Sequence, residues 1–97
     1  MKRSKVVVLW NRGLHLRPAA KLVQVAKQFH SNVYLRCGDK VADLRSILSV
    51  IALCATMGTG LDVEAAGDDE QDAVNAIERV FSSHASKHSD NQSRSLT

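Results

Sequence analysis

The sequence predicts an α+β domain: an open-faced sandwich in which a four-stranded antiparallel sheet carries three helices on one face, in the order βαββαβα. Segments with alternating apolar residues are interleaved with segments whose apolar residues recur at helical spacing, and no internal repeat is present. With 97 residues, the chain is long enough for one sheet packed against a few helices and too short for two separate cores. We therefore expect a single domain.

The first half of the chain supplies three of the predicted strands and the first helix. Residues 4–10 are rich in valine and predict a buried strand, which ends at the turn-forming residues 11–13. Pro18 fits a helix only near its first turn, where a missing N–H costs nothing. Residues 33–37 and 40–43 predict a hairpin with a two-residue loop. The apolar residues of the first helix are Ala19, Leu22, Val23, Ala26 and Phe29.

The second half supplies the remaining elements. Residues 44–53 predict a short, largely buried helix, with a strand as the alternative, and residues 61–65 predict the fourth strand. Acidic residues within 67–70 mark the start of the last helix. The domain is expected to span residues 1–82, followed by a polar, disordered tail over 83–97. The apolar face of the last helix comprises Ala73, Val74, Ile77, Val80 and Phe81.

Composition argues for a soluble, cytoplasmic protein. Apolar residues make up 44% and charged residues 24% of the chain. The apolar stretch 6–10 is shorter than a signal-peptide core, and no run approaches the roughly 20 residues that a membrane span needs. Cys37 and Cys54 are far apart and lack CxxC spacing, so we expect two reduced thiols, no metal site and no cofactor.

The net charge of +3 is unevenly distributed. Residues 1–45 carry a charge of +8 and residues 46–97 a charge of −5. A basic half suits docking onto an acidic protein surface at least as well as nucleic-acid binding. The chain has only four aromatic residues and no pattern for stacking on bases, which disfavours a nucleic-acid-binding module.

The candidate chemistry lies in residues 13–20, which read GLHLRPAA and place His15 at the start of the first helix. The free N–H groups and the positive dipole end of a helix first turn favour a phosphate-sized anion. A neutral imidazole near pH 7 can attack phosphorus to form a transferable phosphohistidine. Arg17 is permanently charged and can neutralise the phosphoryl oxygens. A lone histidine in a turn is more often an ordinary surface residue, so the neighbours of His15 carry the hypothesis.

This stretch, together with RSIL at 45–48 and GDDEQDAV at 67–74, resembles the histidine-containing phosphocarrier (HPr) family of the bacterial phosphoenolpyruvate-dependent sugar phosphotransferase system. The resemblance extends through about Phe81 and implies a carrier rather than an enzyme. By it, His15 accepts a phosphoryl group from enzyme I, charged by phosphoenolpyruvate, and passes it to IIA domains of sugar permeases, with Arg17 assisting. We expect the carrier to be monomeric.

The resemblance also makes Ser46 a regulatory serine, phosphorylated by an HPr kinase/phosphorylase and linked to a transcriptional regulator. A serine at this place also suits a simple helix cap, and both roles can coexist. Phosphate at Ser46 would add about two negative charges and weaken the docking of an acidic enzyme I surface.

A partner-docking patch is expected around His15, although an ordinary core role is the alternative for some of its members. The predicted docking residues are Leu16, Ala20, Gln24, Lys27, Ile47, Leu48 and Ile51.

Two residues depart from the family pattern and bear on partner choice. Leu16 stands where the family usually has a small or polar residue, and Ser49 stands where glycine is frequent. Two related functions stay open: an HPr-like protein of the nitrogen-related branch, and a regulatory partner that binds without carrying phosphate. The intact His15 and Arg17 weigh against the second.

Overall fold

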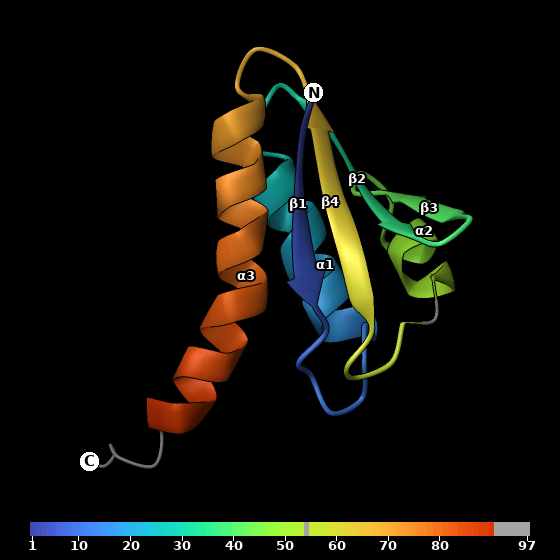
Figure 1. The fold of residues 1–97 in the computed structure, drawn as a ribbon, viewed down its shortest axis with the longest axis vertical. Coiled ribbons are helices and arrows are strands. Elements are labelled where there is room, and N and C mark those ends of the chain that lie inside the picture. The colour runs from blue at the N-terminus through green and yellow to red at the C-terminus, as the bar shows by residue number, and fades with distance from the viewer. Residues whose placement is uncertain (54, 91–97) are drawn as a thin grey trace.

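The computed structural model describes residues 1–53 and 55–90, and the side chains of residues 1–53 and 55–82. Its elements follow the predicted order βαββαβα (Figure 1). They are β1 (Lys2–Val7), α1 (Leu16–Ala26), β2 (Asn32–Cys37), β3 (Lys40–Asp43), α2 (Ile47–Ala52), β4 (Gly60–Ala66) and α3 (Glu70–Asp90). None of the helices in the described segments has the length and apolar character of a membrane span. The thiol of Cys54 and residues 91–97 of the expected tail lie outside the described residues.

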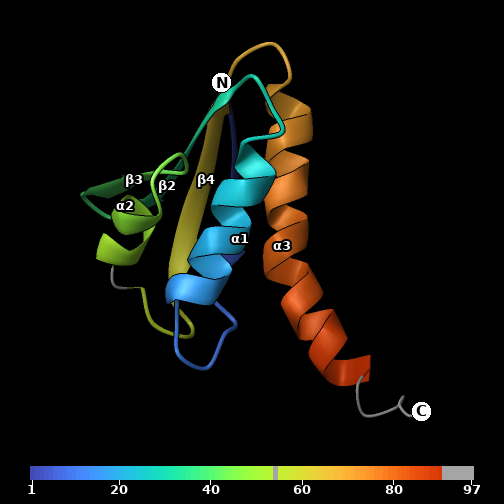
Figure 2. The ribbon, with the colours of Figure 1, turned by 180° about the vertical axis from the view of Figure 1, so that it is seen from behind.

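The four strands form one antiparallel sheet, as predicted, and the structure gives their order as β1-β4-β2-β3. Leu35 of β2 sits opposite Val63 of β4 on one side and Ala42 of β3 on the other, and all three side chains are buried. Viewed from behind, α1 and α3 lie in front of the sheet, and α2 lies beside α1 near β3 (Figure 2). The strands therefore bury one face under the helices, which produces the expected open-faced sandwich.

The opposite face of the sheet buries one carboxylate without a helix above it. The side chain of Glu64 in β4 is only 4% exposed, and its Oε2 lies 3.2 Å from Arg3 Nη2 and 2.9 Å from Arg36 Nε. The hydrogen bond to Glu64 raises the pKa of Arg36. Two guanidinium groups from the neighbouring strands thus satisfy the charge of Glu64 and shield it from water.

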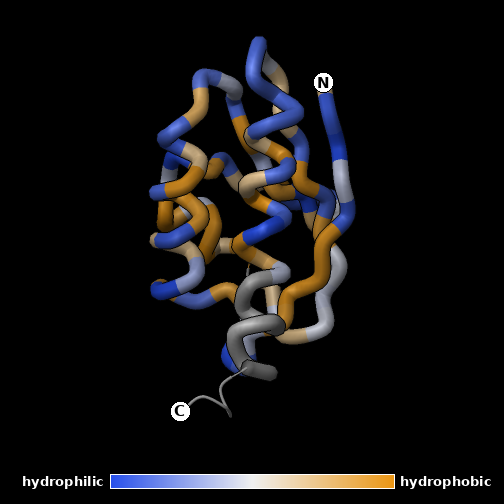
Figure 3. The backbone as a smooth tube through the Cα atoms, turned by 90° about the vertical axis from the view of Figure 1, so that its left-hand side faces the viewer, coloured by the Kyte–Doolittle hydropathy of each residue, from blue (hydrophilic) through white to orange (hydrophobic). Residues whose placement is uncertain are grey.

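The first strand differs from its predicted bounds of 4–10, because it begins at Lys2 and ends at Val7. The regular pairing ends there because β4 starts at Gly60, opposite Val7. Val8 still donates its N–H to the Thr59 carbonyl at 2.9 Å and accepts the Gly58 N–H at 2.7 Å, but these partners belong to the turn before β4. Val8 and Trp10 are nevertheless buried, and the indole of Trp10 packs 5.1 Å from the ring of Phe81. Figure 3 shows this hydrophobic stretch at the end of β1 remote from the hydrophilic N-terminus. The predicted burial was correct, but the predicted strand was displaced.

The helix predicted over 44–53 is confirmed in type and shortened to Ile47–Ala52, and the alternative of a strand is wrong. Leu44 still belongs to the sheet edge, since its N–H donates to the Val33 carbonyl at 3.0 Å. Phe29 packs against the core from beyond the end of α1 rather than from within the helix.

The last helix is longer than predicted. We expected it to give way to a disordered tail after residue 82, whereas α3 continues to Asp90. A helix of 21 residues spans about 31 Å at 1.5 Å per residue. The seven residues of β4 span only about 24 Å. The C-terminal end of α3 therefore extends past the sheet, as Figures 1 and 2 show. Apolar periodicity ends where the helix leaves the sheet, which is why the sequence indicated an earlier end.

Asp69 fastens the loop after α1 to the start of α3. Its Oδ2 accepts the N–H of His30 at 2.8 Å, and its Oδ1 accepts the N–H of Ser31 at 2.9 Å and the Ser31 hydroxyl. The hydroxyl of Ser31 and then the N–H of His30 lower the pKa of the Asp69 carboxyl from its usual 3.8. The folded state therefore favours the ionised form of Asp69.

We predict that Asp69→Asn lowers the free energy of unfolding at pH 7. The variant should also lose less of this free energy than the parent does as the pH falls. A carboxyl whose pKa is lowered by folding stabilises the protein above its unfolded pKa, and this contribution is lost as the pH falls through the folded pKa. The free energy of unfolding from urea titrations at about pH 7, 5 and 2 measures this. Asp68→Asn is the matched control on the neighbouring exposed carboxylate. An Asp69→Asn protein that loses as much stability in acid as the parent would contradict the prediction.

Candidate functional site

His15 is the N-cap residue of α1, as predicted. Its backbone is extended, with φ −96° and ψ −169°, and its carbonyl accepts the first intrahelical hydrogen bond from Ala19 N at 3.0 Å. The side chain is half-buried and makes no capping hydrogen bond. Serine, threonine, aspartate and asparagine are favoured at such places because they do cap. His15 is therefore a poor choice for helix stability, which leaves its imidazole available for chemistry.

The other helices begin differently. At α2 the Ser46 Oγ accepts the Ser49 N–H at 3.2 Å, and at α3 the Glu70 Oε1 accepts the Gly67 N–H at 3.1 Å. Glu70 and Asp72 also place acids in the first turn of α3, whereas the first turn of α1 has none. Among the helices of the described chain, α1 thus combines an uncapped start with an uncompensated positive dipole end.

The turn before His15 is held tightly. Gly13 N donates to the Trp10 carbonyl at 2.8 Å, Leu14 N to the Ala55 carbonyl at 2.9 Å, and His15 N to the Gly13 carbonyl at 3.0 Å. Gly13 has a φ of 73°, and a Cβ there would lie 2.3 Å from the Ala55 oxygen. Only glycine allows this backbone conformation together with such close packing. The contact between residues 13–14 and Ala55 therefore fixes the backbone position of His15.

The first turn of α1 offers donors to an anion beside His15. Leu16 and Arg17 contribute backbone N–H groups that have no intrahelical acceptor, and Pro18 has no N–H to satisfy. The Arg17 side chain is exposed, and no carboxylate pairs with it among the residues that the structure describes. An imidazole, free N–H groups and an unpaired guanidinium at one helix start can together hold a phosphoryl group.

The predicted docking residues divide into exposed and half-buried sets on two helices that pack together. Leu16 and Leu48 are exposed at 63% and 78%, and these values are high for leucine. Gln24 is exposed on α1 and Lys27 is exposed at its C-cap, while Ala20 is half-buried. The remaining two, Ile47 and Ile51, are half-buried and pack against the core, so the core alternative holds in part for them.

Ser46 is exposed, and its capping role at α2 is confirmed. The neighbouring Ser49 is also engaged, because its Oγ accepts the N–H of Asp43 at 3.0 Å. Asp43 in turn accepts a hydrogen bond from the Arg45 side chain, which lowers the pKa of the Asp43 carboxyl. The Ser49 hydroxyl therefore ties α2 to the end of β3.

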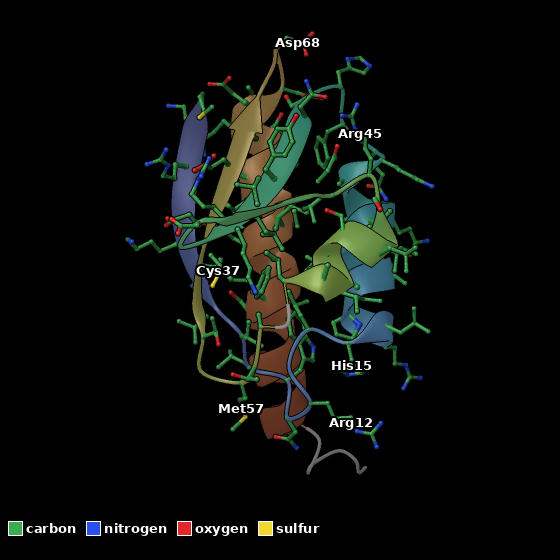
Figure 4. The ribbon with its side chains drawn as sticks, turned by 90° about the vertical axis from the view of Figure 1, so that its right-hand side faces the viewer. Arg12, His15, Cys37, Arg45, Met57 and Asp68 are labelled. Carbon is green, nitrogen blue, oxygen red and sulfur yellow. The ribbon has the colours of Figure 1, made fainter. Side chains whose placement is uncertain are left out.

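The structure also places two residues at the same end of the molecule as His15 that the sequence did not indicate. Arg12 lies on the preceding turn, and Met57, which is 56% exposed, lies on the loop that holds this turn. Figure 4 shows both at this end, with Met57 set apart from His15. For Arg12, the available signal was its place in the sequence directly before the motif. For Met57 the sequence gave no signal, because its loop meets the turn through the tertiary contact at Ala55.

A second group of polar side chains meets at the opposite end of the molecule. The ligand atoms of His30, Asp68 and Asp69 lie within 4.8 Å of one another. The carboxylate of Asp69 already accepts hydrogen bonds on both oxygens, so this cluster is accounted for as the fastening between two loops.

Comparisons with known proteins agree with this geometry. The family model for the PTS HPr component phosphorylation site matches residues 2–83. Phosphocarrier protein HPr of Haemophilus influenzae is 40% identical over 74 residues, which cover 76% of this chain and 87% of the relative. The HPr of Mycoplasma capricolum is 33% identical over 81 residues, covering 84% and 91%. The solved structure of a Mycoplasma histidine-containing phosphocarrier protein superposes with a TM-score of 0.82 at 31% identity, covering 87% of this chain and 96% of that one.

We predict that Gly13→Ala destabilises the protein more than Gly38→Ala does. Both glycines have positive φ, and an alanine there costs about 1–2 kcal/mol. A Cβ at Gly38 meets nothing within 4 Å, whereas one at Gly13 overlaps the Ala55 carbonyl. Urea unfolding measures the difference, and amide NMR shifts of residues 14–17 report displacement of the site. Equal losses for the two variants would show that the packing at Ala55 does not constrain the turn.

Proposed function

This chain belongs to the HPr family of phosphocarrier proteins of the phosphotransferase system, and on that basis we propose that it carries a phosphoryl group on His15. The donor is enzyme I, charged by phosphoenolpyruvate, and the acceptors are IIA domains of sugar permeases. The chain acts as a monomeric carrier in the cytoplasm and catalyses no reaction of its own. The observation that supports this proposal most is the half-buried His15 at the start of α1, where its imidazole makes no capping bond.

Each transfer exchanges one bond to phosphorus for another. A lone pair on a ring nitrogen of neutral His15 forms a bond to phosphorus while the bond between phosphorus and the donor breaks, and its electron pair stays with the donor. Onward transfer breaks the new nitrogen–phosphorus bond, and its electron pair returns to the imidazole. Such a transfer needs alignment and neutralisation of charge rather than new covalent chemistry.

The residues beside His15 provide both the alignment and the neutralisation of charge that the transfer needs. The backbone N–H groups of Leu16 and Arg17 face the place of a bound anion at the positive end of α1. The guanidinium of Arg17 has no competing carboxylate in the described chain, so it is free to bind phosphoryl oxygens in a bidentate manner. The tight turn at Gly13 keeps the backbone of His15 in place before the partner arrives, which lowers the entropy cost of transfer.

The exposed residues of α1 and α2 suit partners with an acidic, partly apolar surface. Leu16 and Leu48 offer apolar contacts, with Lys27 and Gln24 at the edge. The helix α1 contains basic residues and no acid at all, so its surface attracts negatively charged partners. The leucine at residue 16 enlarges the apolar area beside the imidazole and bears on which acceptor is preferred.

Ser46 serves in this proposal as a regulatory site for an HPr kinase/phosphorylase, with a transcriptional regulator as a further partner. It is exposed and borders the docking residues Ile47 and Leu48. Phosphate there adds about two negative charges beside a surface that binds acidic partners. Modification would therefore reduce docking of enzyme I.

A second candidate is an HPr-like protein of the nitrogen-related branch, in which the same chemistry at His15 serves regulators rather than permeases. Phosphoryl transfer from this chain to purified IIA-type acceptors of each branch separates the two, since the proposed assignment requires faster transfer to the sugar branch. A partner that binds without carrying phosphate is disfavoured because His15 and Arg17 are both accessible at the helix start.

We predict that incubation with phosphoenolpyruvate, magnesium and a bacterial enzyme I places one acid-labile phosphate on the chain, and that His15→Ala abolishes it. The nitrogen–phosphorus bond is the reason for the acid lability. His30→Ala is the matched control, since His30 is an exposed histidine on the loop after α1. Phosphate uptake by His15→Ala equal to that of the parent would refute the site.

We predict that Ser46→Ala removes acid-stable phosphorylation by an HPr kinase, while Ser82→Ala, at another exposed serine, does not. Ser46→Asp should slow phosphorylation of His15 by enzyme I, because the added charge opposes docking. Aspartate also caps helices well, so this variant keeps α2 intact, whereas Ser46→Ala costs about 0.5–2 kcal/mol in stability. An Asp variant that is phosphorylated on His15 as fast as the parent would limit Ser46 to capping.

A further inference from the structure

Arg12 presents an unneutralised positive charge directly before the His15 motif. It lies on the turn of residues 10–13, which is closed by the Gly13 N–H to Trp10 carbonyl bond of 2.8 Å. Its side chain is exposed, and within residues 1–53 and 55–82 no carboxylate or carbonyl accepts a hydrogen bond from its guanidinium. Figure 4 shows Arg12 on the turn that runs next to His15.

The backbone between Arg12 and His15 is short and fixed. Three peptide bonds separate the two residues, so their Cα atoms are at most about 11 Å apart. The hydrogen bond of 3.0 Å from His15 N to the Gly13 carbonyl shortens this separation further. The contacts of Gly13 and Leu14 with Ala55 hold the turn in place. Only the side chain of Arg12 must become ordered for its guanidinium to reach an anion on His15.

We propose that Arg12 is a second cation, besides Arg17, that contacts the phosphoryl group on His15. Arg17 lies in the first turn of α1, after the histidine, and Arg12 lies on the turn before it. A phosphoryl group carries three oxygens and close to two negative charges, so two guanidinium groups can bind different oxygens. This inference rests on the proposed phosphorylation of His15 and adds a residue that holds the phosphorylated form.

A contact with phosphate and a contact with the partner have different consequences. A cation that touches the phosphoryl group stabilises the phosphorylated protein over the free one, so it shifts the equilibrium of loading. A cation that only helps the partner to dock accelerates transfer in both directions and leaves the equilibrium constant unchanged. The equilibrium constant therefore separates the two roles.

The experiment compares the parent with Arg12→Ala, Arg12→Lys and the control Arg79→Ala, an exposed arginine on α3. Each is equilibrated with phosphorylated enzyme I, and the fractions of both phosphoproteins are measured from both directions. We expect Arg12→Ala to lower the equilibrium constant for loading by about fivefold, the upper range for an exposed ion pair. Arg12→Lys should restore part of the loss, Arg79→Ala should change nothing, and the difference should shrink at high salt.

A second measurement needs no protein partner. The protein is phosphorylated with phosphoramidate, and the Nε–H signal of Arg12 is followed by NMR, with Arg79 as the internal reference. We expect the Arg12 signal to shift on phosphorylation and the Arg79 signal to stay. Circular dichroism melting confirms that the variants fold, since Arg12 is exposed.

Two results would overturn the inference: an unchanged equilibrium constant for Arg12→Ala, even with slower transfer, or an Arg12 signal that ignores phosphorylation. Either result leaves the phosphocarrier proposal standing, provided that the parent is loaded on His15. A parent that takes no phosphate on His15 from enzyme I or phosphoramidate would instead overturn the proposed function, and this inference with it.

Discussion

The contact of residues 13–14 with the carbonyl of Ala55 is the constraint on which the site depends. The N–H of Leu14 donates to this oxygen at 2.9 Å, and the missing side chain of Gly13 leaves room for it. Through this contact the loop before β4 fixes the turn before α1, although Leu14 and Ala55 are 41 residues apart in sequence. Because the turn is fixed by packing, the start of α1 does not need a capping side chain, and His15 can occupy the N-cap. The folding free energy that a capping side chain at α1 would contribute is supplied by other contacts in the fold.

The beginnings of the helices show how the chain divides stability and function. At α3, the Glu70 side chain accepts a backbone N–H, and at α2 the Ser46 hydroxyl does so. The start of α1 instead keeps its N–H groups and dipole open beside an imidazole. Unpaired N–H groups at a helix start raise the free energy of the folded protein unless an anion accepts their hydrogen bonds. A phosphoryl group is therefore stabilised most by the fold when it is bound at this place. Ser46 caps α2 with its hydroxyl and is itself exposed.

The charged side chains divide in the same way into those that are paired within the fold and those that are available for binding. On the outer face of the sheet, Glu64 is shielded between Arg3 and Arg36, so these charges neutralise one another within the fold. Near His15, the described chain offers no carboxylate to Arg12 or Arg17, and their charges stay available for binding. The uneven charge of the sequence thus becomes a functional surface only where the basic residues lack acidic neighbours.

The sequence by itself determined the order of elements, the hairpin at Gly38 and the place of His15 at the start of α1, because local periodicity, turn residues and the proline at residue 18 act over a few residues. It also identified Ser46 as a cap. Only the tertiary structure decided that β1 ends at Val7, since that limit is set by where β4 begins. The same holds for α3, whose helix continues past Phe81, the last residue of its predicted apolar face, to Asp90. The half-burial of Ile51 and the exposure of Leu48 depend on how α2 packs on α1. The tie between the loop before β4 and the turn before His15 depends on the contact at Ala55. Local patterns determine which segments form and where the chemistry lies along the chain, whereas packing between distant segments determines which side chains surround that chemistry.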